Sequence, residues 1–135
     1  MIIFHYRREP FGRGEHVWRP VADVFLEGKS GKWIEFHPYI DSGADITMIP
    51  FSLGKLIGLS AEAQKTEEIG GIRGSVPVIH VRHRISIGGK ILKIRIAWAL
   101  LEEVPPLLGR SDVFDAFNVL FQQNKKTIIF ENSPS

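Results

Sequence analysis

The stretch Asp41-Ser42-Gly43-Ala44-Asp45-Ile46-Thr47 carries the most information in this sequence of 135 residues. It is a polar break between two apolar segments. Two carboxylates that share one proton can hydrolyse a peptide bond, because one activates a water while the other protonates the carbonyl oxygen. A glycine after the carboxylate allows a tight turn, and the neighbouring hydroxyl can hydrogen-bond across to a second such loop. Taken alone, however, an Asp-Ser-Gly triplet predicts only an ordinary turn between strands.

The segments on both sides of this break alternate between apolar and polar residues with the period of two that is typical of β-strands. Gly88-Gly89 predicts a two-residue hairpin turn, and Gly28 to Lys32 predicts another turn. The segment from Ile46 to Leu59 fits a strand followed by a short helical turn. The expected strands are Val17–Leu26, Trp33–Ile40, Pro77–Ile87, Ile91–Leu100 and Thr127–Glu131.

One helix is predicted near the C-terminus, with Ser111 as its N-cap. The apolar residues that follow have the spacing of an amphipathic helix; they are Val113, Phe114, Phe117, Leu120 and Phe121. Residues 1–16 contain a proline and two glycines and are expected to form an irregular arm over the surface. Residues 132–135 are expected to be a free tail. The chain is therefore predicted to be one mostly-β domain over residues 17–131 with a single helix.

Four marks in this order resemble the retropepsin family of retroviral-type aspartic proteases. Asp41 to Thr47 resembles the active-site loop of that family. Ile69-Gly70-Gly71-Ile72-Arg73-Gly74 resembles the flap tip, a glycine-rich hairpin that closes over substrate. Leu107-Leu108-Gly109-Arg110 resembles the segment before the single C-terminal helix, and Arg19-Pro20 resembles a similar pair on the first long strand. Ser42 stands where threonine is commoner, and Arg73 stands where the family has a small residue.

The resemblance implies a retropepsin-like closed β-barrel or sheet domain that is active as a two-fold symmetric homodimer. Of the five aspartates, only Asp41 is followed by a hydroxyl residue and glycine. One chain therefore supplies half of a catalytic pair, and a second copy must supply the other half. Asp41 is the expected catalytic residue, and Ser42 and Gly43 are expected to support the loop. The resemblance also implies that Thr127 to Phe130 joins an intersubunit sheet.

The resemblance assigns further roles around the catalytic loop. The residues expected to contact a peptide substrate are Ala44, Asp45, Ile69, Gly70, Gly71, Ile72 and Arg73. Asp45 is also expected to form a structural ion pair with Arg110 and with Arg19, since arginine binds carboxylates bidentately. The expected partners are a second copy of the chain and a peptide or protein substrate, with no cofactor.

The remaining composition excludes several classes of site. There is no cysteine, so disulfides and thiolate metal sites are excluded, and the paired histidines His80 and His83 fall on opposite faces of a strand. The net charge of +2 is spread along the chain, which argues against nucleic-acid binding despite a pI near 9.0. No stretch has the roughly 20 apolar residues of a membrane span, and no secretory signal is recognised, so a cytoplasmic protein without membrane association is expected.

Two functions remain open at this stage. The first is an aspartic endopeptidase. The second is a non-catalytic dimeric module that keeps the fold and binds peptides or proteins in a retained cleft. The joint presence of Asp41, Gly43, Asp45 and a glycine-rich flap favours the enzyme, because a pure scaffold would need none of them together.

Overall fold

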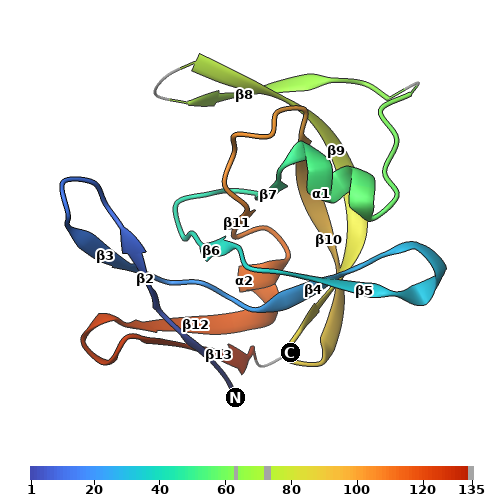
Figure 1. The fold of residues 1–135 in the computed structure, drawn as a ribbon. Coiled ribbons are helices and arrows are strands. Elements are labelled where there is room, and N and C mark those ends of the chain that lie inside the picture. Colours follow the sequence, from blue (N-terminus) through green and yellow to red (C-terminus); the bar gives the residue numbers. More distant parts are fainter. Residues whose placement is uncertain (63, 72–73, 134–135) are drawn as a thin grey trace.

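A computed structural model describes residues 1–62, 64–71 and 74–133 of the chain. Most of it is β-structure (Figure 1). The strands are β1 Ile2–His5, β2 Arg7–Pro10, β3 His16–Arg19, β4 Val24–Glu27, β5 Trp33–Phe36, β6 Tyr39–Ile40, β7 Thr47–Ile49, β8 Glu67–Gly71, β9 Gly74–Ile87, β10 Lys90–Ala99, β11 Leu107–Leu108, β12 Phe117–Gln122 and β13 Thr127–Asn132. The helices are α1 Phe51–Leu56 and α2 Val113–Ala116, with 3-10 turns η1 Lys29–Gly31 and η2 Gln123–Lys125.

Eight strands form the large sheet, in the order β5-β4-β9-β10-β7-β11-β6, with β8 paired to β9 outside this path. The sheet curls into a half-barrel around the core (Figure 1). Its centre is the long antiparallel hairpin of β9 and β10. Gly88 and Gly89 turn this hairpin with φ angles of 57° and 86°, a conformation that glycine adopts without steric cost. The predicted two-residue turn is confirmed.

Alternate residues of the central hairpin fill the core. Ile85 and Ile87 of β9 and Ile94 and Ile96 of β10 are fully buried, whereas Ser86 between the first pair is half-buried and Arg95 between the second pair is exposed. Burial of one such side chain contributes about 1.5–3 kcal/mol, so this single hairpin supplies a large share of the apolar stabilisation. The period-two pattern in the sequence therefore identified the main inward face of both strands. It missed the burial of Ala97, which the pattern placed on the polar side and which packs with Val78 and Ala99 in a second buried cluster.

Helix α1 packs closely on Trp98, the largest buried side chain of β10. The indole ring stacks on Phe51 with ring centroids 5.5 Å apart, and its Nε1 donates a hydrogen bond to the Phe51 carbonyl oxygen at 3.1 Å. A Cβ atom at Gly54 would lie 2.0 Å from Trp98 Nε1, so only glycine fits at this contact. The expected order of strand and short helix after the catalytic loop is confirmed, as β7 and α1.

The N-terminal segment differs from the prediction. Residues 1–16 are not irregular, because β1 pairs with β13 and β2 forms a separate hairpin with β3. The strand expected from Val17 to Leu26 is also interrupted between β3 and β4. Pro20 lies in this gap, and proline has no N–H to donate to a sheet ladder. The chain can therefore leave one sheet and enter another at this point.

The C-terminal helix is shorter than the apolar spacing predicted. It ends at Ala116, and Phe117–Gln122 forms strand β12, which pairs with β13. Phe117, Val119 and Phe121 also alternate in the way that a strand with one buried face requires. The apolar spacing from Val113 to Phe121 therefore fits both a helix and a strand. The N-cap is Asp112, not Ser111, and its backbone N–H donates to the Asp115 carboxylate at 3.1 Å.

The C-terminal strand β13 lies at the centre of a three-stranded antiparallel sheet, between β1 and β12. The resemblance implied that this strand joins an intersubunit sheet. Both of its edges are paired within the chain, from Ile2↔Phe130 on one side to Phe117↔Asn132 on the other. A strand of a second subunit could extend this sheet only at β1 or β12, whose outer edges are unpaired in the described part of the chain.

We predict that Glu102→Gln destabilises the fold in a pH-dependent way, because Glu102 anchors the first turn of α1. Its Oε1 accepts the Ser52 backbone N–H at 2.9 Å, and its Oε2 accepts the Ser52 hydroxyl. The hydroxyl bond, and then the backbone bond, lower the pKa of Glu102. This stabilisation is present above the carboxylate's unfolded pKa of about 4.3 and is lost as pH falls through the lower folded value.

Urea unfolding followed by intrinsic tryptophan fluorescence at one protein concentration should show a lower midpoint for Glu102→Gln at neutral pH. The difference from the parent chain should shrink as the solution is acidified below about pH 4.5. Glu103→Gln is the matched control, since Glu103 is the next exposed glutamate and accepts no side-chain hydrogen bond from the described residues. A difference that stays constant with pH would contradict the anchoring role.

Candidate active site

The candidate catalytic loop, residues 41–46, begins where β6 ends and leads into β7. Strand β6 runs parallel to β11, so that Tyr39 pairs with Leu107 and Ile40 with Leu108. The Asp41 N–H continues this ladder by donating to the Leu108 carbonyl oxygen at 3.0 Å. The backbone of Asp41 is therefore held by the sheet itself, while the residues that follow it leave the sheet and turn.

The turn orients the Asp41 carboxylate. The Gly43 N–H donates to Oδ1 of Asp41 at 2.9 Å, and the Ala44 N–H donates to the Asp41 carbonyl oxygen at 3.2 Å. A Cβ atom on Gly43 would lie 3.2 Å from this Oδ1, so glycine permits the close approach. The other carboxylate oxygen, Oδ2, accepts no hydrogen bond from the described residues. Asp41 is half-buried, and this oxygen is available to a reacting group.

The Arg110 side chain stabilises the loop by contacts with Ser42 and Asp45. Its Nη1 donates to the Ser42 carbonyl oxygen at 2.8 Å, and its Nη2 pairs with Oδ1 of Asp45. Backbone bonds add to this brace, because the Arg110 N–H donates to the Ala44 carbonyl oxygen at 2.9 Å. The side chains of Arg110 and Asp45 are 48% and 82% exposed, so the ion pair alone contributes little to stability. Its effect is to hold both ends of the turn in one geometry.

A buried hydrogen bond between Thr47 and Gly109 also holds the loop against residues 107–110. Thr47 is the one polar residue buried in the described part of the chain, and its Oγ1 accepts the Gly109 N–H at 3.1 Å. A Cβ atom on Gly109 would lie 2.5 to 2.9 Å from the backbone of Ile46. Residues 107–110 and the loop therefore touch backbone to backbone, which explains the glycine of that motif.

The flap-like segment forms a hairpin, as expected. Strand β8 pairs with β9 from Glu67↔Val78 to Gly71↔Gly74. Ile69 and Gly70 lie on β8, and Gly71 is its last residue. Ile72 and Arg73, the expected tip, lie outside the described residues.

A pocket of about 440 Å³ lies between the candidate catalytic loop and this hairpin. It is lined by Gly43, Ala44, Asp45, Ile46, Met48, Ile69, Gly70, His80 and Leu107. The structure thus brings four of the sequence-predicted substrate-contacting residues together in one cavity, namely Ala44, Asp45, Ile69 and Gly70. His80 in the same wall was not assigned a role from the sequence.

A second pocket of about 540 Å³ has Asp41 in its wall. The wall also includes Glu9 and Pro10 of β2, which belong to the segment expected to form an irregular arm over the surface. Glu9 accepts the Tyr39 hydroxyl at 2.7 Å, and this bond, with a smaller contribution from burial, raises the pKa of Tyr39. Sequence reasoning missed this wall, because Glu9 and Tyr39 are thirty residues apart and share no motif.

Arg19 is placed differently from the expected ion pair. In the described part of the chain its Nε lies 3.2 Å from Oε1 of Glu9, and no contact with Asp45 is made within the chain. Its guanidinium also lies over the ring of Tyr39, 5.6 Å from the centroid. Arg19 therefore joins the β2–β3 hairpin to the strand that leads into Asp41, and Arg110 alone pairs with Asp45 here.

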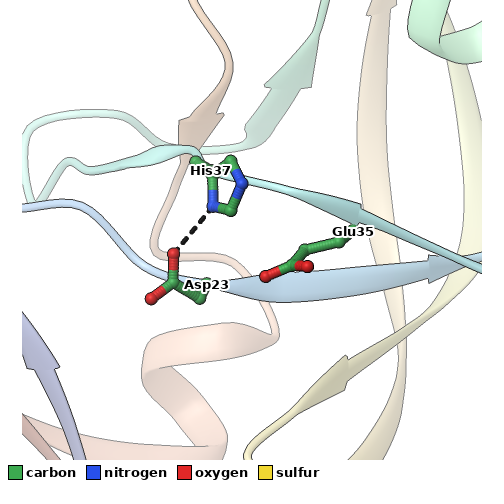
Figure 2. A group of neighbouring side chains, drawn as sticks. All are labelled: Asp23, Glu35 and His37. Atoms are coloured by element: carbon green, nitrogen blue, oxygen red, sulfur yellow. Dashed lines mark hydrogen bonds and ion pairs between the residues drawn. The ribbon is translucent and has the colours of Figure 1, made fainter.

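A group of side chains with metal-ligand chemistry lies elsewhere on the surface. Oxygen and nitrogen atoms of Asp23, Glu35 and His37 lie within 4.8 Å of one another, and Figure 2 shows Asp23 and His37 pointing toward each other. Oδ1 of Asp23 lies 2.7 Å from His37 Nδ1 and 2.5 Å from Nη2 of Arg7. Because the guanidinium already neutralises Asp23, we assign the group to an ion-pair cluster that fastens β2 to the chain between β3 and β4.

Structural comparison identifies the architecture. A retropepsin-like aspartic protease from Rickettsia conorii superposes with a TM-score of 0.68 at 16% identity, covering 95% of this chain and 98% of that one. EIAV protease complexed with the inhibitor HBY-793 superposes with a TM-score of 0.58 at 20% identity, covering 79% of this chain and 93% of that one. The chain has the retropepsin-like fold. In this retropepsin-like chain, Asp41 to Asp45 form the loop at the centre of the candidate site.

Sequence comparison adds no nearer relative of this retropepsin-like chain. No protein-family model matches it, and no curated protein sequence matches it. Among the described residues, no helix is long and apolar enough to cross a membrane.

We predict that Gly109→Ala destabilises the chain by about 1–3 kcal/mol, because the added methyl group has no space against the Ile46 backbone. Gly70→Ala is the matched control, since a Cβ atom there meets nothing within 4 Å. Chemical denaturation of both variants at one protein concentration measures the difference. Equal stability of the two variants would show that the loop can move away from residue 109 without cost.

Proposed function

We propose that this chain is one subunit of a homodimeric aspartic endopeptidase, in which Asp41 from each subunit forms the catalytic pair. The observation that carries the proposal is the way in which hydrogen bonds hold the backbone and the carboxylate of Asp41. Its backbone is clamped by the sheet, one carboxylate oxygen is oriented by Gly43, and the other accepts no hydrogen bond from the described residues. A carboxylate held in this way is suited to exchange a proton with a water or a carbonyl oxygen.

The other aspartates support the need for a second subunit, because each already has a partner within the chain. Asp23 pairs with Arg7, and Asp45 pairs with Arg110. Asp112 accepts the Arg95 backbone N–H at 2.8 Å, and Asp115 accepts the Asp112 N–H at 3.1 Å. Of these four aspartates, only Asp45 lines a pocket, and it is held in the ion pair with Arg110. A second copy of Asp41 is therefore the natural partner.

In the proposed reaction, the two Asp41 carboxylates share one proton. The ionised group takes a proton from a water, and that water attacks the peptide carbonyl carbon while the protonated group donates to the carbonyl oxygen. The group that took the water's proton then donates it to the peptide nitrogen as the C–N bond breaks, and the other carboxylate takes a proton back from a hydroxyl of the diol intermediate as the product carboxyl group forms. Ser42 and Gly43 hold the loop, and the exposed Asp45 carboxylate accepts substrate backbone N–H groups. Ile69 and Gly70 of the β8–β9 hairpin contact the peptide from the opposite wall of the pocket.

We predict that Asp41→Asn lowers peptide hydrolysis by at least about a hundredfold, because it removes the proton-transferring group while keeping the side-chain shape. Asp115→Asn is the control, since asparagine retains an oxygen that can accept the Asp112 N–H. Cleavage of a pool of short peptides, read by mass spectrometry, measures both. Full activity of Asp41→Asn would exclude Asp41 as the catalyst. Peptide binding without Asp41-dependent cleavage by the parent chain would favour the non-catalytic binding module.

A mixing experiment tests the shared site. Inactive Asp41→Asn subunits added in ninefold excess to the parent chain should reduce activity per parent subunit to about one tenth, because random pairing leaves few dimers with two carboxylates. The Asp41→Asn, Gly109→Ala double variant, whose fold is weakened, should inhibit less. Activity that is independent of the added subunits would show that one chain is sufficient.

A further inference from the structure

The pocket between the candidate catalytic loop and the β8–β9 hairpin has an acidic residue, Glu67, next to its wall residue His80. Its walls are aliphatic, formed by Ile46, Met48, Ile69 and Leu107. Side chains two residues apart on a strand point to the same face of the sheet, and Glu67 and Ile69 are two residues apart on β8. Since Ile69 lines the pocket, Glu67 lies on the same face of the hairpin, toward its base.

Glu67 is held only loosely at this position. Its Oε2 lies 3.4 Å from Nε2 of His80, which itself lines the pocket, and the Glu67 side chain is 54% exposed. Among the described residues no lysine or arginine pairs with Glu67, so no permanently charged cation offsets its carboxylate. The other carboxylate near the pocket, Asp45, already pairs with Arg110. Glu67 is therefore the carboxylate without a lysine or arginine partner beside the aliphatic wall.

We infer that this pocket selects a lysine or arginine side chain of the peptide substrate, and that Glu67 is the residue that determines this selectivity. The methylene stem of such a side chain covers the aliphatic wall while its charged end reaches the Glu67 carboxylate. Because the site is solvent-exposed, the charge contributes a modest factor, about two- to fivefold in affinity. This inference rests on the proposed function, since it names the substrate class of the same site.

The test compares peptide pairs that differ only in lysine or norleucine, which has the same stem without the charge. Binding to Asp41→Asn protein at pH 7 is measured by fluorescence anisotropy, so that catalysis is not required. The peptides come from a random pool selected for binding, and each position is substituted in turn. At one position the Asp41→Asn protein should prefer lysine, and Glu67→Gln in this background should reduce that preference about two- to fivefold.

Two further variants, in the same background, separate a specific contact from a general charge effect. Glu68→Gln removes the same charge from the neighbouring residue of β8, which points to the opposite face, and should leave the preference unchanged. His80→Gln removes the competing partner of Glu67 and should maintain or increase the preference. If His80 and Glu67 served only to stabilise the flap, both substitutions would instead weaken binding of both peptides equally.

Each result bears on a distinct claim. An unchanged lysine preference in Glu67→Gln, an equal loss in Glu68→Gln, or failure to bind any peptide overturns the inference. Asp41-dependent cleavage together with an unchanged preference overturns the selectivity alone and leaves the proposed endopeptidase intact. A Glu67-dependent preference without any cleavage by the parent chain supports the peptide site and overturns the peptidase.

Discussion

The candidate site depends on the close contact between the backbone of residues 107–110 and the loop that begins at Asp41. Strand β11 lies between β6 and β7, so one short strand positions both ends of the loop. Glycine at 109 allows the two backbones to approach, and Thr47 accepts the amide that this approach buries. A buried amide left without an acceptor would cost about 1–3 kcal/mol, so the hydroxyl and the glycine act together.

This constraint explains why the charges around the loop contribute to geometry more than to stability. Arg110 binds the Ser42 carbonyl oxygen and the Asp45 carboxylate at the protein surface, where ion pairs contribute about 0–1 kcal/mol. Two contacts from one planar guanidinium nevertheless limit how residues 42–45 can turn. The orientation of Asp41 is thus determined by backbone packing below the loop and by a polar brace beside it.

The N-terminal strands contribute a pocket wall that the sequence motifs did not predict. The first strand pairs with the last one, and the β2–β3 hairpin then brings Glu9 to the wall of a pocket beside Asp41. The ion-pair cluster of Arg7, Asp23 and His37 fastens this hairpin to the body of the domain. Because β13 is already paired on both edges, assembly of two subunits would have to use surfaces other than the edges of that strand.

The sequence by itself determined the local features whose cause lies in neighbouring residues. Alternation identified the main buried face of β9 and β10, the glycine pair identified their turn, and the break from Asp41 to Asp45 was expected as a loop between two apolar segments. The brace between Arg110 and Asp45 was also expected correctly, because both residues belong to recognisable motifs.

Tertiary structure alone decided the remaining features, because they depend on partners that are distant in the chain. The stripe from Val113 to Phe121 fits a helix or a strand, and pairing with β13 selected the strand after Ala116. Arg19 met Glu9 because the β2–β3 hairpin places them together. Glu67 came within 3.4 Å of His80, a residue of the pocket wall, through the register of β8 with β9, which no spacing along the sequence reveals. Local pattern determines which faces are apolar, and long-range pairing determines which charges meet.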